Sequence, residues 1–99
     1  MILLLRWTEQ AVGQLSAIAD YISQSSPRYA EGMIARIAAR LLVAAEHPEL
    51  GRRVPEFNDL RIRELLESPY RLIYRPRAEC IEVIAIVHER QLLEQARAR

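Results

Sequence analysis

The chain has 99 residues, of which 51% are hydrophobic and 27% are charged, and its formal net charge is +1. This length leaves room for one hydrophobic core, so we expect a single domain spanning residues 1–99. A chain this apolar is not intrinsically disordered, and a net charge near zero argues against a broadly basic surface that binds nucleic acid.

The opening apolar run, residues 1–5, is far shorter than a membrane span and ends at Arg6. No basic segment precedes it, so we expect neither a signal peptide nor a transmembrane helix, and we expect a cytoplasmic protein. Cys80 is the only cysteine, so it cannot form an internal disulfide or supply a zinc site of the usual type. We expect no cofactor and no metal.

The hydrophobic pattern predicts one strand and two helices in the first half of the chain. Ile2–Trp7 is typical of a short buried strand. Thr8 is a good N-cap for a helix that ends near Gln24, along which apolar residues recur every three or four positions. The "SSP" of residues 25–27 ends this helix and begins a second, which stops before Pro48. A connection of about three residues predicts that the two helices form an antiparallel hairpin.

The second half of the chain is expected to form most of the sheet. Residues 48–59 show no regular spacing of apolar residues and are expected to form a surface connection. After them, apolar residues recur at every second position, as in a strand. Three strands are predicted, at Leu60–Leu66, Tyr70–Arg75 and Cys80–His88, with gaps short enough for antiparallel hairpins. The last of them is apolar at nearly every position, which predicts a central place in the sheet with cover on both faces. A short helix is expected from about Glu89.

These elements predict an α+β fold. The N-terminal strand and the three-stranded antiparallel meander form a four-stranded sheet, the helical hairpin packs on one face, and a short C-terminal helix follows. The other face of the sheet is left open, and its side chains are therefore candidates for function.

All 14 basic residues are arginines, and lysine is absent. A guanidinium binds carboxylate or phosphate through two parallel hydrogen bonds and does not act as a base at neutral pH. Side-chain alternation places Arg71 and Arg75 on one face of their strand, and Arg61 and Arg63 on one face of theirs. If the apolar sets of both strands face the helices, these four arginines converge on the open face. His88 ends the last strand, where a structural or rim position is the simpler interpretation.

Other side chains of these strands also have structural interpretations. The two arginines of the strand Tyr70–Arg75 could pair with Glu64 or Glu82 on a solvated face. Tyr70 and Tyr74 are expected in the core rather than as platforms on which nucleic-acid bases stack.

The order of the elements and several motifs resemble the RelE/ParE superfamily of toxins from bacterial type II toxin–antitoxin systems. The motifs are the "GRRVPEF" connection, the "RIRELLESPYRLIYRP" hairpin and the ending that contains Val87, His88 and Arg90. The resemblance spans nearly the whole chain. It implies a growth-inhibiting toxin that is neutralised by a cognate antitoxin, a protein whose C-terminal segment covers the toxin's functional face.

The resemblance leaves two mechanisms open. RelE-type toxins cleave messenger RNA on the ribosome, whereas ParE-type toxins have no known nuclease activity and some of them inhibit DNA gyrase. Metal-free cleavage needs a base, an acid and cations at the phosphate, which RelE-type toxins supply with lysine, arginine and tyrosine or with a Glu/His/Tyr set. This chain lacks lysine, and Glu89 stands where that second set has tyrosine. The ParE-type interpretation therefore leads.

The candidate site residues follow from these two mechanisms. A ParE-type toxin needs no catalytic residue, and its expected partner-binding residues are Arg61, Arg63, Arg71, Arg75, His88 and Arg90. A RelE-like, ribosome-dependent endoribonuclease would use Arg61, Arg63, Arg71, Arg75 and His88 for catalysis. The expected partners are the antitoxin and DNA gyrase, without a membrane and without direct binding of nucleic acid. A third possibility is an inactive relative that only pairs with an antitoxin.

Overall fold

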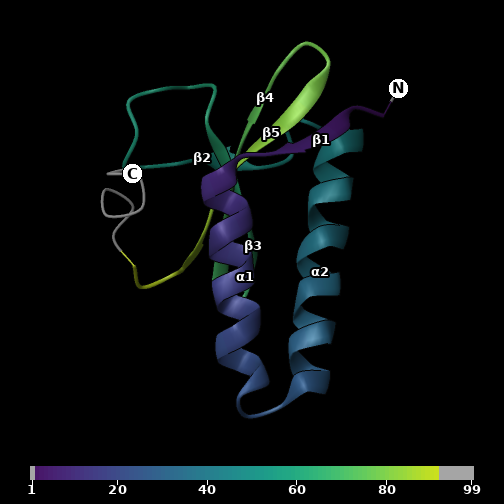
Figure 1. Ribbon diagram of the computed structural model, residues 1–99. Coiled ribbons are helices and arrows are strands. Elements are labelled where there is room, and N and C mark those ends of the chain that lie inside the picture. Colours follow the sequence, from purple (N-terminus) through teal and green to yellow (C-terminus); the bar gives the residue numbers. More distant parts are fainter. Residues whose placement is uncertain (1, 92–99) are drawn as a thin grey trace.

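The computed structural model describes residues 2–91. Its elements are β1 (Leu4–Trp7), α1 (Glu9–Ser23), α2 (Pro27–Glu46), β2 (Arg52–Arg53), β3 (Arg63–Glu67), β4 (Tyr70–Pro76) and β5 (Cys80–His88). The strands form one sheet in the order β1-β5-β4-β3-β2, and the two helices form a hairpin beside it (Figure 1). The α+β class, the helical hairpin and the β3-β4-β5 meander are confirmed.

The sheet differs from the expected one in the number and direction of its strands. It has five strands rather than four, because Arg52 and Arg53 pair with Glu64 and Arg63 of β3. It is mixed rather than antiparallel, since β1 runs parallel to β5. β2 lies inside the connection that was expected to be irregular, and two residues are too few to show a period of two.

Several element boundaries also differ from the expected ones. β1 begins at Leu4 rather than Ile2, and β3 begins at Arg63 rather than Leu60. Arg61 therefore lies in the connection before β3 and not on a strand. Residues 89–91 form a turn and a bend rather than the start of a helix, and the rest of the expected C-terminal helix lies outside the described residues.

The two helices begin at side-chain caps. The hydroxyl oxygen of Thr8 accepts a hydrogen bond from the backbone N–H of Ala11, and that of Ser26 accepts one from Tyr29, each at 3.1 Å. These bonds satisfy N–H groups that have no partner within the first turn of a helix. No helix within residues 2–91 is long and apolar enough to cross a membrane.

The main core lies between the helical hairpin and the sheet. Its most buried side chains come from α2 and from the helix-facing positions of the meander, among them Met33, Ile37, Leu41, Leu72, Tyr74, Ile81 and Ile86. Tyr70 and Tyr74 belong to this core, as the sequence indicated. Burying this apolar surface is the main contribution to stability.

A second, smaller core covers part of the opposite face, which we call the second face of the sheet. Val54, Phe57 and Ile62 of the connection between β2 and β3 pack over Ile73 of β4 and Ala85 of β5, with further strand residues beside them. β5 therefore has apolar cover on both faces, and it lies between β1 and β4. Its predicted central place is confirmed, but the second face is not fully open.

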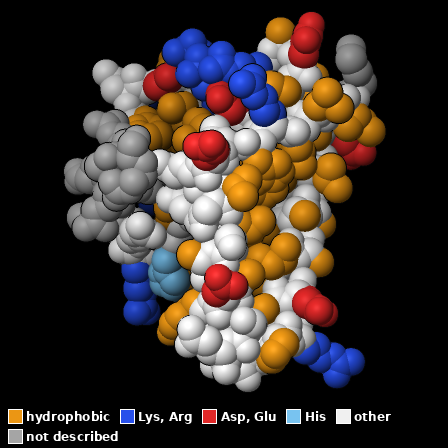
Figure 2. Space-filling model, viewed as in Figure 1, with side chains coloured by type: hydrophobic (Ala, Val, Ile, Leu, Met, Phe, Trp, Pro, Cys, Tyr) orange, Lys and Arg blue, Asp and Glu red, His pale blue; other side chains and the backbone are white. Residues whose placement is uncertain are grey.

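Part of the helical hairpin remains uncovered. Tyr21 is 74% exposed and Leu42 is 54% exposed. Figure 2 shows a band of hydrophobic side chains along the hairpin. A hollow of about 510 Å³ lies between the helices, lined by residues that include Ala19, Ile34 and Ala35. A contiguous apolar surface of this kind is typical of a contact site for a partner.

Candidate functional site

Residues of β4 alternate between the two faces of the sheet. Tyr70, Leu72 and Tyr74 pack in the main core, so Arg71 and Arg75 point to the second face. This orientation agrees with the one expected for these two arginines.

The side chains of β3 that face the helices are the opposite set from the one expected. Leu65 packs in the main core, so Arg63, two residues earlier on the strand, also lies on the helix-facing side. Its Nη1 donates to the carbonyl oxygens of Glu49 and Gly51 at 3.2 and 2.7 Å. Ile62, expected to face the helices, packs in the second core instead. The expectation that four arginines converge on one face is therefore wrong.

Arg71 is held in a partly buried network of ion pairs on the second face. Its Nε donates to Oε1 of Glu64 at 2.7 Å, and its Nη1 and Nη2 each donate to one carboxylate oxygen of Glu56 at 2.8 Å. Nε of Arg52 donates to the other oxygen of Glu64 at 2.6 Å. Arg71 is only 7% exposed, and the Glu64 side chain is fully buried. Two arginines and two carboxylates thus neutralise one another.

Sequence reasoning found one of these contacts and missed the others. The sequence interpretation paired Arg71 and Arg75 with Glu64 or Glu82 on a solvated face. The contact between Arg71 and Glu64 is confirmed, but the pair is buried rather than solvated. No ion pair of Arg75 is found within residues 2–91. Glu56 and Arg52 lie in the connection after α2, whose sequence gives no period from which to orient a side chain. The only available signal was the "GRRVPEF" motif itself.

Hydrogen bonding shifts the pKa values of two members of the network, Glu56 and Arg71. The hydrogen bond from Arg71 lowers the pKa of Glu56 below its usual value, although partial burial works in the other direction. The bonds to Glu56 and then to Glu64 raise the pKa of Arg71 above its already high value, again against the effect of burial. Both directions favour the charged forms of Glu56 and Arg71 at neutral pH.

Replacing Glu56 with glutamine should make stability less sensitive to acid. The folded-state pKa of Glu56 is lowered, so its contribution to stability is present above about pH 4.3 and is lost as pH falls through the folded value. Urea unfolding from neutral pH into this acid range should show a smaller loss of unfolding free energy in Glu56→Gln than in the wild type. Glu31→Gln, on the exposed side of α2, is the control and should follow the wild type. Parallel curves for Glu56→Gln and wild type would contradict the role of this ion pair.

His88 lies at the end of β5, opposite Tyr70. The two rings meet edge to face, with centroids 5.9 Å apart. Nδ1 of His88 accepts a hydrogen bond from the backbone N–H of Arg90 at 3.1 Å, which stabilises the turn after the strand. The structural interpretation of His88 is supported by these contacts, and Arg90 itself is exposed.

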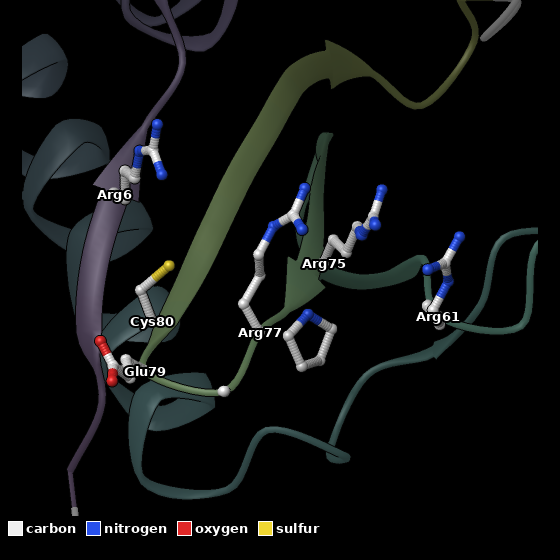
Figure 3. Close-up of a pocket in the computed structure, with 8 residues that line it drawn as sticks. Arg6, Arg61, Arg75, Arg77, Glu79 and Cys80 are labelled. Carbon is white, nitrogen blue, oxygen red and sulfur yellow. The ribbon is translucent and has the colours of Figure 1, made fainter.

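A second group of arginines lines a shallow cavity of about 430 Å³ at the end of the sheet where β4 turns into β5 (Figure 3). The group, which we call the arginine cluster, consists of Arg6, Arg61, Arg75 and Arg77. Arg61 and Arg75 were candidates from the sequence, whereas Arg6 and Arg77 were missed. The cluster joins β1, the connection before β3, β4 and the β4–β5 turn, which are brought together only by the sheet.

The chain is thus a small α+β domain with a helical hairpin on one face of a mixed sheet and arginines on the other face. The family described as the ParE toxin of the type II toxin–antitoxin system, parDE, matches residues 5–93. The chain belongs to this toxin family, and the superfamily resemblance is confirmed.

Two individual proteins illustrate the relationship. The chain is 34% identical over 87 residues to Toxin RelE2 of Caulobacter vibrioides, covering 87% of this chain and 94% of that protein. A solved structure of the chromosomal ParDE TA system from P. aeruginosa has a TM-score of 0.71 to this chain at 24% identity. It covers 88% of this chain and 96% of the other, and it shows the same fold.

Proposed function

We propose that this toxin inhibits growth in the cytoplasm by binding DNA gyrase, without cutting RNA, and that a cognate antitoxin neutralises it. The observation that carries the proposal is that the guanidinium group of Arg71 is already hydrogen-bonded to two carboxylates. Metal-free cleavage of RNA needs cations that are free to meet charge developing on the phosphate. Nε, Nη1 and Nη2 of Arg71 already donate to Glu56 and Glu64, and a phosphate would have to displace a carboxylate held by two hydrogen bonds. Displacement would also weaken the pairing of a buried charge, which is costly.

The spacing of the remaining candidates also disfavours a nuclease. His88 pairs with Tyr70 at one end of β4, while Arg75 lies five residues further along the same strand. Five residues of strand span about 17 Å, so the two side chains cannot act on one phosphate. Arg63 is engaged with backbone carbonyls on the helix-facing side. This separation of the five residues of the expected nuclease set supports the proposal of a toxin that does not cut RNA.

The same positions are suited to binding a protein. Arg61, Arg75 and Arg90 are at least partly exposed and are proposed to contact gyrase, which carries bound DNA when it supercoils. Arg63, Arg71 and His88 are proposed to shape the same surface through their internal contacts. The antitoxin is proposed to cover the apolar band of the helical hairpin together with the uncovered part of the second face, because both are costly to leave in water.

Two assays on the purified toxin test this proposal. Gyrase should lose supercoiling activity or accumulate cleaved DNA, while the message on translating ribosomes should stay intact. Cleavage at the ribosomal A site that disappears in Arg71→Ala or His88→Ala would establish the nuclease instead. A toxin that affects neither target and is harmless when expressed would be an inactive, antitoxin-binding relative.

A further inference from the structure

The sheet register places members of the arginine cluster in one row across three strands. Glu82 of β5 pairs with Arg6 of β1 on one side and with Arg75 of β4 on the other. Side chains of paired residues point to the same face, so all three side chains project from the second face of the sheet. The Cα atoms of the two arginines are about 10 Å apart, because they are separated by two strand spacings. Arg77, in the turn after β4, donates from Nε to Glu82 at 3.0 Å. The row is therefore set by backbone pairing and not by flexible side chains alone.

Only half of the cluster is paired with carboxylates. Arg61 donates from Nε and Nη2 to the carboxylate of Asp59 at 3.1 and 3.2 Å, and Arg77 is paired with Glu82. No carboxylate within residues 2–91 lies at ion-pair distance from Arg6 or Arg75. In Figure 3 the four guanidinium groups stand on one side of the sheet, and the carboxylate of Glu79 points away from them towards β1. The cluster thus combines two guanidinium groups that have no carboxylate partner among the described residues with two that are held by one.

We propose that the arginine cluster binds a phosphate group, either free or in a nucleic-acid backbone. A phosphate group presents several oxygens in a tetrahedral arrangement and can accept hydrogen bonds from more than one guanidinium at once. Asp59 and Glu82 hold Arg61 and Arg77 in place, so less side-chain freedom is lost on binding.

The rest of the cavity wall supports a phosphate over a peptide or a base. Apart from the arginines, the described residues that line it are Pro76, Ala78, Glu79 and Cys80. None of these is an aromatic side chain on which a base could stack, and none forms the deep apolar pocket that anchors a peptide. Binding at this site should therefore be independent of base sequence.

This inference rests on the proposed function and specifies the group that Arg61 and Arg75 would contact. That group is a phosphate of the DNA bound to gyrase. The inference can be tested on the toxin alone, so its failure would leave inhibition of gyrase open. The net charge of +1 argues against a broad basic surface, but a local cluster is sufficient for one or two phosphates.

Nuclear magnetic resonance titration of the ¹⁵N-labelled full chain in a chloride buffer is the direct test. Pyrophosphate should shift the backbone amide signals of Arg6, Arg75 and Arg77. Arg6→Gln and Arg75→Gln should each weaken binding about tenfold, the effect of losing one charge-assisted contact. Arg28→Gln, an equal change of charge on the exposed start of α2, should leave the affinity unchanged. The spectra of the variants report at the same time whether they are folded.

A single-stranded and a duplex oligonucleotide distinguish the sources of the phosphate. Binding of pyrophosphate alone would assign a free phosphate ligand. Binding of the oligonucleotides would assign the nucleic-acid backbone. In that case the slope of the logarithm of the binding constant against the logarithm of the salt concentration should be smaller in magnitude by about one in Arg75→Gln. The proposal is overturned if no signal shifts at millimolar pyrophosphate or if Arg28→Gln weakens binding as much as Arg75→Gln. It is also overturned if an oligo-glutamate peptide binds the cluster more tightly than pyrophosphate does.

Discussion

Replacing Arg71 with methionine should lower the free energy of unfolding by about 3–5 kcal/mol, the usual effect of removing one partner from a buried ion pair. Methionine retains much of the apolar volume but removes all three donated hydrogen bonds. The fully buried carboxyl group of Glu64 would then have Arg52 as its remaining partner. Proteins of this size are stable by only about 5–15 kcal/mol, so urea unfolding followed by circular dichroism should resolve the loss clearly.

Two further variants separate burial from charge in this prediction. Arg52→Gln removes an arginine whose side chain is 64% exposed and that pairs with the same Glu64, and it should cost less than about 1 kcal/mol. Combining Arg71→Met with Glu64→Leu should restore most of the lost stability, because the buried carboxylate is removed together with its partner. If Arg71→Met costs no more than Arg52→Gln, the network does not make the contribution inferred from its burial.

The same variants bear on function. In the proposed gyrase-binding mechanism Arg71 shapes the second face but does not carry out chemistry. The double variant should therefore retain gyrase inhibition to the extent that it folds. A fully folded double variant that loses all activity would indicate a direct role for Arg71 or Glu64.

The features that local sequence determines were predicted well. The caps at Thr8 and Ser26 depend on short-range hydrogen bonds, so the starts of both helices could be inferred from a few residues. The continuous apolar run of Cys80–His88 indicated cover on both faces, and the strand is central in the sheet. The meander followed from gaps too short for any other connection.

Features that depend on long-range register were not accessible in the same way. Ile62 and Leu65 are both apolar, so the sequence could not show which of them marks the helix-facing side of β3. Choosing the side of Ile62 placed Arg63 on the wrong face. Arg6 and Arg75 are far apart in the chain, and they become neighbours in a row only because Glu82 pairs with both.

Adding a single carbon at Gly51 should also have a large effect on the free energy of unfolding. A Cβ at this position would lie 2.7 Å from the carbonyl oxygen of Glu64 and 2.7 Å from the hydroxyl oxygen of Tyr74. The first of these atoms belongs to the backbone of β3 and cannot move without shifting the strand. The second accepts a hydrogen bond from the N–H of Gly51 and donates one to the carbonyl of Pro48, each at 2.8 Å. Gly51 is therefore fixed between two elements by a close approach that only glycine allows.

Gly51→Ala should lower the free energy of unfolding by about 3 kcal/mol, through overpacking and a weakened hydrogen bond to Tyr74. Gly13→Ala provides a matched control, because its added Cβ meets nothing within 4 Å and lies inside α1. There alanine should raise stability by about 0.5–1 kcal/mol. The midpoint temperature of thermal unfolding should therefore fall in Gly51→Ala and rise in Gly13→Ala, although the chemical change is the same. Equal shifts in one direction would show that helix propensity and close packing do not govern these two sites.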